Sequence, residues 1–321
     1  MGCSSSSAIE TIINKSFYQL TNFYTINKYE PNLLDNYGIL SVLELDNDRF
    51  LVLVQYDKIL IYDSKNFEVI HVMSLESSAN SIIKFKNDKY IFGGDDNKLS
   101  LLEIGKNSYK ILSSVSCETH ISKILKNGEE IIASSYNNIS FYNLNNKNEF
   151  ILKNTINNTL DNSIFNIYVA NNLLLSLMYG LRDVKKNELI IYDLNDNNKI
   201  VHKEEKASIM PWNNSVCNFN SELLIISGND LGIRIFEIKT FKILAQIKGL
   251  DFFYSVFSQG NKIFCGGNSG KIYEFEYNSN NNELKLIKDI KIHESSIFSI
   301  TKISSGSIVT SSRDGTIKFF R

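Results

Sequence analysis

The chain has 321 residues, 43% of them hydrophobic, and a formal net charge of −1. This length suits either two ordinary domains or one large all-β domain, and the apolar content is ample for a core. The charge gives no electrostatic reason to expect nucleic acid as a partner, because proteins that bind it carry basic patches. Only two prolines occur, so no Pro-rich linker divides the chain.

The chain begins with the residues Met-Gly-Cys-Ser-Ser-Ser-Ser. Gly2 with Ser6 fits the pattern for N-myristoylation, and Cys3 is well placed for palmitoylation. The alternative is a Ser-rich disordered start without modification. We expect residues 1–16 to form an N-terminal tail that is acylated at Gly2 and Cys3.

The cysteines and apolar runs bear on the cellular compartment. No charged-then-apolar signal peptide is present, and the longest apolar runs, such as 173–178, are far too short to span a bilayer. None of the four cysteines forms a CxxC motif, and we expect a reducing compartment. With the acylation motif, this predicts a cytoplasmic protein associated with the cytosolic face of a membrane.

Residues 17–26 form the first predicted strand, because they alternate in polarity and are rich in aromatic and β-branched residues. No neighbouring strand precedes this segment. Six units of four predicted strands follow, over residues 39–73, 81–115, 121–156, 164–203, 215–247 and 254–292. The last unit has only three strands, at 297–303, 307–311 and 316–320. The chain therefore has a spare strand at one end and lacks one at the other.

The third strands of these units end alike, with an aromatic or apolar residue and then, usually, an acidic one. The seven endings are Tyr62-Asp63, Leu102-Glu103, Tyr142-Asn143, Tyr192-Asp193, Phe236-Glu237, Phe275-Glu276 and Phe320-Arg321. Successive endings lie 39 to 50 residues apart, which is typical of the blades of a β-propeller. Asn is frequent in the turns between the strands, as at 280–282, because it tolerates left-handed backbone angles.

The last unit carries the most specific pattern. His293 precedes the inner strand, Thr310 lies on the second, Asp314 and Gly315 make a tight turn, and Phe320 ends the third. This stretch closely resembles a WD40 repeat of the β-propeller family. In that family a His, a Ser or Thr, an Asp and a Trp at these positions bond together. Phe320 can fill the Trp position but has no N–H to donate.

The resemblance implies an all-β, seven-bladed, WD40-like β-propeller as a single domain over residues 17–321, with blades from 39 to 321. The strand at 17–26 would supply the missing fourth strand of the last blade. Closing the ring in this way removes a sheet edge that would otherwise invite aggregation. The family also implies a rigid, non-enzymatic platform for protein partners.

In this family the top rim carries the loops from the fourth strand of one blade to the first strand of the next, and the turns between second and third strands. Three top loops here, 179–187, 207–214 and 249–254, break the repeat in length or composition. We expect them to converge on one sector of the rim, because blades 4, 5 and 6 are sequential in the ring. Aromatic residues and Arg are the residue types that anchor interfaces. The candidate partner-binding residues of these loops are Arg182, Lys185, Lys186, Trp212, Phe252 and Phe253. Alternatively, Trp212 and the two Phe side chains fill the space between blades.

These observations favour a protein-interaction scaffold tethered to a membrane through acyl chains, with other proteins as partners. No nucleophile–base set or phosphate-binding glycine loop indicates an enzyme, a cofactor or a small-molecule substrate. Cys117 and His120 share a CxxH spacing without a second pair, so no metal site is expected. Three alternatives stay open: a soluble subunit of a larger complex, a phosphoinositide-binding propeller using Arg182, Lys185 and Lys186, and an enzyme using the central channel.

Overall fold

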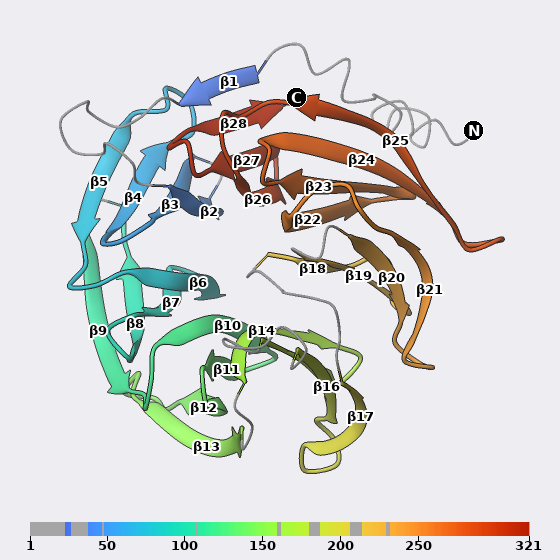
Figure 1. The fold of residues 1–321 in the computed structure, drawn as a ribbon. Coiled ribbons are helices and arrows are strands. Elements are labelled where there is room, and N and C mark those ends of the chain that lie inside the picture. Colours follow the sequence, from blue (N-terminus) through green and yellow to red (C-terminus); the bar gives the residue numbers. More distant parts are fainter. Residues whose placement is uncertain are drawn as a thin grey trace, which may run out of the picture.

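The computed structural model describes residues 23–26, 38–46, 48–106, 108–158, 162–179, 187–205, 214–228 and 232–320. These residues form 28 strands in seven antiparallel sheets of four. The sheets stand around a central axis like the blades of a propeller, with one strand of each next to the axis (Figure 1). The predicted all-β, seven-bladed fold is confirmed.

Six blades are each built from four consecutive strands. Blade 1 is β2 (Ile39–Asp46), β3 (Arg49–Val54), β4 (Lys58–Asp63) and β5 (Val69–Ser74); blade 2 is β6 (Ala79–Lys86), β7 (Lys89–Gly94), β8 (Lys98–Ile104) and β9 (Tyr109–Ser116); blade 3 is β10 (Ile121–Asn127), β11 (Glu130–Ser135), β12 (Asn138–Leu144) and β13 (Phe150–Asn157). Blade 4 is β14 (Ser163–Ala170), β15 (Leu173–Tyr179), β16 (Glu188–Asp193) and β17 (Lys199–Glu205); blade 5 is β18 (Val216–Asn218), β19 (Leu223–Ser227), β20 (Ile233–Glu237) and β21 (Lys242–Ile247); blade 6 is β22 (Phe253–Gln259), β23 (Lys262–Gly267), β24 (Lys271–Asn278) and β25 (Glu283–Lys291).

Blade 7 joins the two ends of the described chain. It consists of β26 (Ile297–Lys302), β27 (Ile308–Ser312) and β28 (Ile317–Phe320), with β1 (Phe23–Ile26) as its outer strand. β1 runs antiparallel to β28, in a register that places Phe23 opposite Phe320 and Ile26 opposite Ile317. The N-terminal strand therefore closes the ring, as the sequence predicts, and residues 17–22 of the predicted closing strand lie outside the described residues.

The core is divided among the gaps between blades. The buried apolar side chains of the described residues form seven clusters, each shared by two neighbouring blades. Because side chains alternate along a strand, a middle strand supplies both of its flanking clusters. Along β3, Phe50 and Val52 face blade 7, whereas Leu51 and Leu53 face blade 2. Apolar residues are therefore needed at every position of such a strand.

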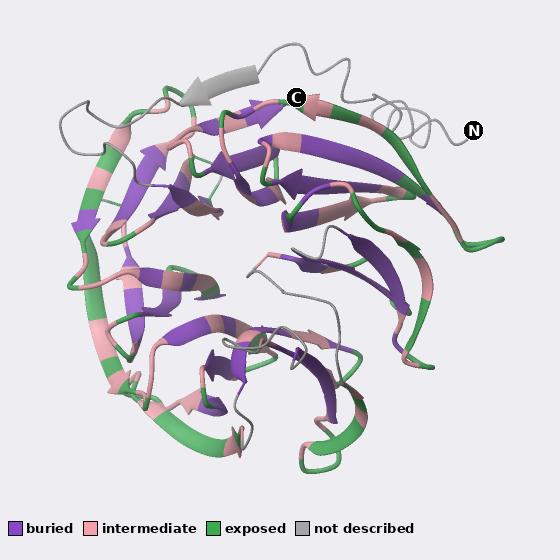
Figure 2. Cartoon of the chain, in the orientation of Figure 1, coloured by how far each residue is buried: buried purple, intermediate pink, exposed green. Residues whose placement is uncertain are grey.

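The outer strands have a different pattern of buried and exposed residues, because only one of their faces is covered by a neighbouring blade. Figure 2 shows the strands near the axis mostly buried and the outermost strands alternating between exposed and partly buried residues. The residues that end the third strands are buried in every blade. They are Tyr62, Leu102, Tyr142, Tyr192, Phe236, Phe275 and Phe320. The recurring sequence feature thus marks a core position between blades.

The inner strands share an irregularity that the sequence does not reveal. In six of the seven, the pairing with the second strand shifts by one residue near the start of the inner strand, at its second residue in five blades and at its third in blade 4. A β-bulge of this kind bends the strand and turns one side chain out of the regular alternation. The residues at these shifts are Leu40, Asn80, Ser122, Phe165, Tyr254 and Phe298. They occupy equivalent places next to the axis.

Two glycines end second strands where neighbouring chain passes close by. A Cβ atom at Gly94 would overlap the carbonyl oxygen of Ser78, and one at Gly267 would overlap the carboxylate of Asp251. Both contacts are with the loop that enters the same blade. These positions therefore require glycine because of close packing, and not because the strand must bend there.

Candidate functional site

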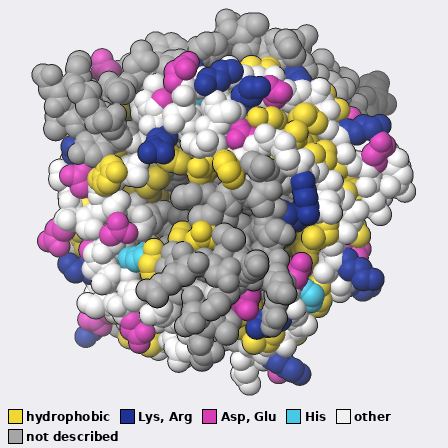
Figure 3. Space-filling view, in the orientation of Figure 1, with side chains coloured by type: hydrophobic (Ala, Val, Ile, Leu, Met, Phe, Trp, Pro, Cys, Tyr) yellow, Lys and Arg dark blue, Asp and Glu magenta, His cyan; other side chains and the backbone are white. Residues whose placement is uncertain are grey.

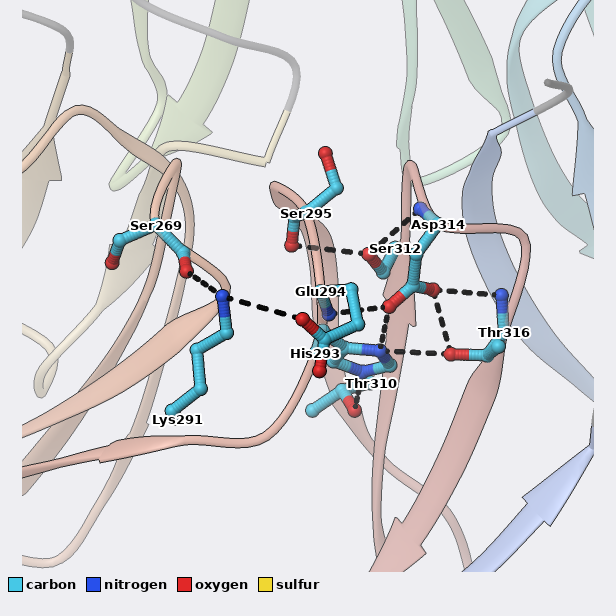
Figure 4. Close-up of polar contacts among 9 residues, drawn as sticks. All are labelled: Ser269, Lys291, His293, Glu294, Ser295, Thr310, Ser312, Asp314 and Thr316. Carbon is cyan, nitrogen blue, oxygen red and sulfur yellow. Dashed lines mark hydrogen bonds and ion pairs between the residues drawn. The ribbon is translucent and has the colours of Figure 1, made fainter.

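The imidazole of His293 is the centre of a buried network in blade 7 (Figure 4). Its Nδ1 atom lies 3.1 Å from Oδ2 of Asp314 and 2.9 Å from Oγ1 of Thr316, and its Nε2 lies 2.8 Å from Oγ1 of Thr310. A carboxylate can only accept, so Nδ1 carries the hydrogen and Nε2 accepts from the Thr310 hydroxyl. The network joins the loop before β26, strand β27 and the β27–β28 turn.

The protonation states follow from this setting. Burial lowers the pKa of His293, although the carboxylate of Asp314 acts in the opposite direction. Burial alone would raise the pKa of Asp314, but hydrogen bonds from His293 and Thr316 outweigh it and hold that pKa well below its usual range. A neutral imidazole and an ionised carboxylate are the forms that fit the hydrogen bonds.

Phe320 takes the place that the resemblance assigned to Trp. Its side chain is 4% exposed and packs with Phe264 and Ile297 in the cluster between blades 6 and 7. Within the described residues, the Thr310 hydroxyl bonds only to His293. The bonded chain therefore runs from Asp314 through His293 to Thr310 and stops there.

Other blades link the entering loop to the turn after the second strand, or to the first residue of the third strand, with different chemistry. In blade 2, Glu76 of the entering loop pairs with Lys98 at 3.1 Å. In blade 3, the amide of Asn138 donates to Glu118 at 3.0 Å. In blade 6, the hydroxyl of Ser269 donates to Asp251. The partners lie 18 to 22 residues apart in each case. These pairs were not predicted from the sequence, and their regular spacing is the signal that could have revealed them.

The top face, which carries the entering loops and the turns between second and third strands, is hollowed at the axis. A cavity of about 430 Å³ opens there and is bordered by residues of six blades. Four of the bulged residues contribute to its wall, namely Leu40, Asn80, Tyr254 and Phe298. Lys123 and Arg313 also line it. We call this cavity the channel mouth. None of these six residues was predicted as a site residue, because their convergence depends on the ring and the bulges.

An aromatic row lies on the top face of blades 3 and 4. The rings of Tyr136 and Phe165 are 5.8 Å apart, and those of Phe165 and Tyr179 are 5.7 Å apart, measured between centroids. His120 contacts Tyr136 at 3.5 Å. All four side chains are partly exposed. Figure 3 shows hydrophobic side chains gathered toward the middle of one face of the ring, with many charged side chains nearer its rim.

The structure places only some of the predicted rim residues. Phe252 is 40% exposed in the loop before β22, where a partner could reach it. Phe253 is fully buried and packs edge-on against Tyr273 and Phe275, so the prediction that it contacts a partner on the rim is corrected. The alternation along β22 turns the second of these neighbouring side chains into the blade interface. Arg182, Lys185, Lys186, Trp212, Gly2 and Cys3 lie outside the described residues.

The described residues contain no group of three or more His, Cys, Asp or Glu side chains placed to hold a metal ion. Cys117 instead contacts the hydroxyl of Tyr142, with its Sγ atom 3.7 Å away. No helix long and apolar enough to cross a membrane is found in this part of the chain.

Seven four-stranded blades and an N-terminal closing strand define a seven-bladed β-propeller. The chain is similar to the WD40 beta propeller domain of Doa1, with a TM-score of 0.70 and 14% identity over 92% of this chain and 95% of that one. It is also similar to the structure of U3-55K, with a TM-score of 0.72 and 11% identity over 92% of this chain and 98% of that one. No family model and no curated protein sequence matches the chain. At these identities the likeness concerns the fold.

Proposed function

We propose that this protein is a non-enzymatic scaffold that binds other proteins on its top face and is held at the cytosolic face of a membrane by acylation of Gly2 and Cys3. The observation that carries the binding role is the group of accessible aromatic side chains on that face. Phe252 is 40% and Tyr56 is 53% exposed, and both belong to short loops of a rigid ring. Loops on rigid scaffolds are where binding residues collect.

The aromatic row supports the sector chosen from the sequence. Tyr179 ends β15, at the start of the 179–187 loop, and its ring contacts Phe165 of the neighbouring inner strand. Phe252 belongs to the loop entering blade 6, two blades further around the ring. A partner that spans this sector could contact both. Aromatic side chains supply much of the binding energy in protein interfaces.

A test of the binding role is the change of Trp212 to Ala. Truncating an interface Trp typically costs on the order of 2 kcal/mol or more, which is about a thirtyfold loss of affinity. We expect Trp212→Ala and Phe252→Ala to lose a partner that wild-type protein retains in a quantitative pull-down. Both variants should melt at nearly the wild-type temperature.

Leu152→Ala provides the matched control, because Leu152 is 56% exposed on the outer strand β13 and lies away from the top face. It should retain the partner. If Trp212→Ala unfolds instead, Trp212 is a core residue, and if both rim variants retain every partner, the binding surface lies elsewhere.

A further inference from the structure

The channel mouth differs from the rest of the top face because its lining is set by the bulges of the inner strands. Tyr254 and Phe298, from adjacent blades 6 and 7, contact each other edge to face with ring centroids 5.4 Å apart. The side-chain amide of Asn214 donates to the carbonyl oxygen of Phe298 at 2.9 Å, and the Tyr254 hydroxyl donates to Asn268 at 3.1 Å. These contacts hold the two rings in place, so this part of the cavity wall is preformed.

The charges in the wall are mainly positive. Lys123, next to the bulge of β10, and Arg313, in the β27–β28 turn, both line the cavity. Burial lowers the pKa of Lys123 to about 8, which leaves it mostly charged at neutral pH. Arg313 is exposed, and the described residues include no hydrogen-bond or ion-pair partner for its guanidinium.

The one carboxylate in the described lining is already engaged. Oδ1 of Asp95 accepts a hydrogen bond of 2.7 Å from the side-chain amide of Asn80. The same amide also donates to the carbonyl oxygen of Ile121 in the next blade. Asp95 is therefore fixed within the wall. The molecule as a whole has a net charge of −1. An anion would therefore be attracted by the nearby cations of the cavity wall and not by the charge of the whole protein.

The lip of the cavity holds a strained aromatic residue. Tyr56, in the β3–β4 turn, has φ = 84° and is 53% exposed. Positive φ is costly for an aromatic residue and tends to occur at binding sites that are held in a fixed shape. The backbone N–H of Tyr56 donates to Oγ of Ser78 at 3.1 Å, which fastens this turn to the loop entering blade 2. An exposed ring is thereby held beside the opening.

We propose that the channel mouth binds an acidic peptide segment of a partner protein, with its carboxylates on Lys123 and Arg313 and an apolar side chain against Tyr254 and Phe298. The inference rests on the proposed scaffold function and names the chemistry of its ligand. A cavity of about 430 Å³ is within the ordinary range of ligand sites. Because Arg313 and Tyr56 are exposed at the lip, the ligand extends from the cavity onto the top face, as a peptide does.

The test uses a library of random peptides displayed on phage and selected on the full chain. Selected peptides should be enriched in Asp or Glu next to Leu, Ile or an aromatic residue. One of them, labelled with a fluorophore, is then titrated with wild type, Lys123→Gln and Arg313→Gln. Each variant should bind at least about tenfold more weakly, since each removes one charge that a carboxylate contacts. Replacing the peptide's Glu with Gln should cause a similar loss.

Lys302→Gln is the matched control, because Lys302 is an exposed lysine at the opposite end of the inner strand β26. It should bind the peptide as wild type does. Arg313 lies in an exposed turn, so Arg313→Gln keeps the test valid even if a substitution of Lys123 on an inner strand lowers stability.

Several results would overturn the inference: no enrichment of acidic residues, equal binding by wild type and both channel variants, or displacement of the peptide by equimolar inorganic phosphate. The outcome also separates the two proposals. If peptide binding depends on Phe252 or Trp212 but not on Lys123 or Arg313, the result supports the scaffold function and rules out the channel mouth as the binding site. If binding of acidic peptides depends only on Lys123 and Arg313, the result supports the channel mouth and rules out the rim as the binding site.

Discussion

A single buried imidazole connects three separate segments of blade 7. His293 reaches Asp314 and Thr316 in the β27–β28 turn through one nitrogen and Thr310 on β27 through the other. Its side chain is shielded from water, so each of these hydrogen bonds replaces one that solvent would otherwise provide. The loop before the inner strand is therefore fixed by the network and not only by backbone pairing.

Changing Thr310 to Val tests how much this network stabilises the protein. Valine has a similar shape but no hydroxyl, so Nε2 of His293 would be left buried without its donor. An unsatisfied buried polar group costs about 1–3 kcal/mol, and we expect a lower melting temperature in a thermal scan. Thr301→Val, on the neighbouring strand and partly exposed, is the control and should melt close to wild type. Equal melting of the two variants would contradict the role assigned to Thr310.

The lowered pKa of His293 predicts how stability depends on pH. A histidine whose pKa in the folded state is below its usual value of 6.5 stabilises the fold fully above that value. This contribution is lost as the pH falls through the folded pKa, because the unfolded chain binds the proton more readily. The melting temperature of wild type should therefore fall from about pH 7 to about pH 5. The fall should be smaller in His293→Gln, which cannot take up the proton.

Thr301→Val serves as the control, because Thr301 has no titratable group and lies outside this network. It should keep the pH dependence of wild type. If His293→Gln keeps it too, His293 does not titrate in this range in the way its burial implies.

The resemblance of residues 293–320 to a WD40 repeat was enough to predict that His293, Thr310 and Asp314 bond together, because their hydrogen bonds form within one blade and over a short length of chain. Tyr254, Phe298 and Lys123 could not be found in that way. Each is one ordinary residue in a strand, and only the bulges and the ring bring them to one cavity. The sequence also could not tell which of Phe252 and Phe253 is exposed. Both are Phe, and only the start of strand β22 decides which side chain points into the blade interface.

At the scale of the strands, β1 is the element whose loss should matter most. It is the fourth strand of blade 7, and it pairs with β28 along four residue pairs. Without it, the backbone edge of β28 would be open to solvent. An open edge strand offers unpaired backbone groups to other chains.

Deleting residues 1–28 should therefore lower the melting temperature and promote aggregation. For a protein of this size, each kcal/mol of lost stability lowers that temperature by about 2 °C. Differential scanning calorimetry with light scattering would measure both effects. Deletion of residues 1–16, which keeps β1, is the matched control and should melt as the full chain does. An unchanged melting temperature after removal of residues 1–28 would show that β1 does not hold the ring closed.

The strands themselves could be predicted because both faces of the middle strands must be apolar and the turns carry Asn and Gly. The bonds between the entering loop and the turn were predicted only in blade 7. In blades 2, 3 and 6 the same link uses Glu76 with Lys98, Glu118 with Asn138, and Asp251 with Ser269. A search for one set of residue types cannot find a contact that each blade makes with another pair.

On the scale of the molecule, the seven core clusters lie between blades, and none is central. Each blade depends on its two neighbours, so stability resembles a sum over the interfaces around the ring. The axis is left free of such a core, which is why a cavity forms on the top face. The number of blades could be predicted from the period at which the strand pattern repeats in the sequence. The identity of a partner could not be predicted, because partner binding produces no repeating pattern.

The proposed anchor gives a prediction for the whole protein in its own cells. One myristoyl chain gives only marginal, reversible membrane binding, so Cys3 would need to supply a second chain. Gly2→Ala should abolish association with the membrane fraction, and Cys3→Ser should weaken it. Metabolic labelling with a myristate analogue and fractionation would measure this, and Ser5→Ala provides a control that leaves both acylated positions intact. A wild-type protein that takes up no label and remains soluble would remove the anchor from the proposal.

The closure by β1 also determines when the native ring can exist. Ile26 precedes its partner Ile317 by 291 residues. A ribosome that adds about 5–20 residues per second needs about 15–60 s to make that length. Throughout this time β1 has been translated but its partner has not, while the intervening blades emerge one by one. Every nascent chain therefore passes through an open-ring stage with an unpaired strand, and translation that stops before β28 leaves β1 permanently unmatched for chaperones and proteases to recognise.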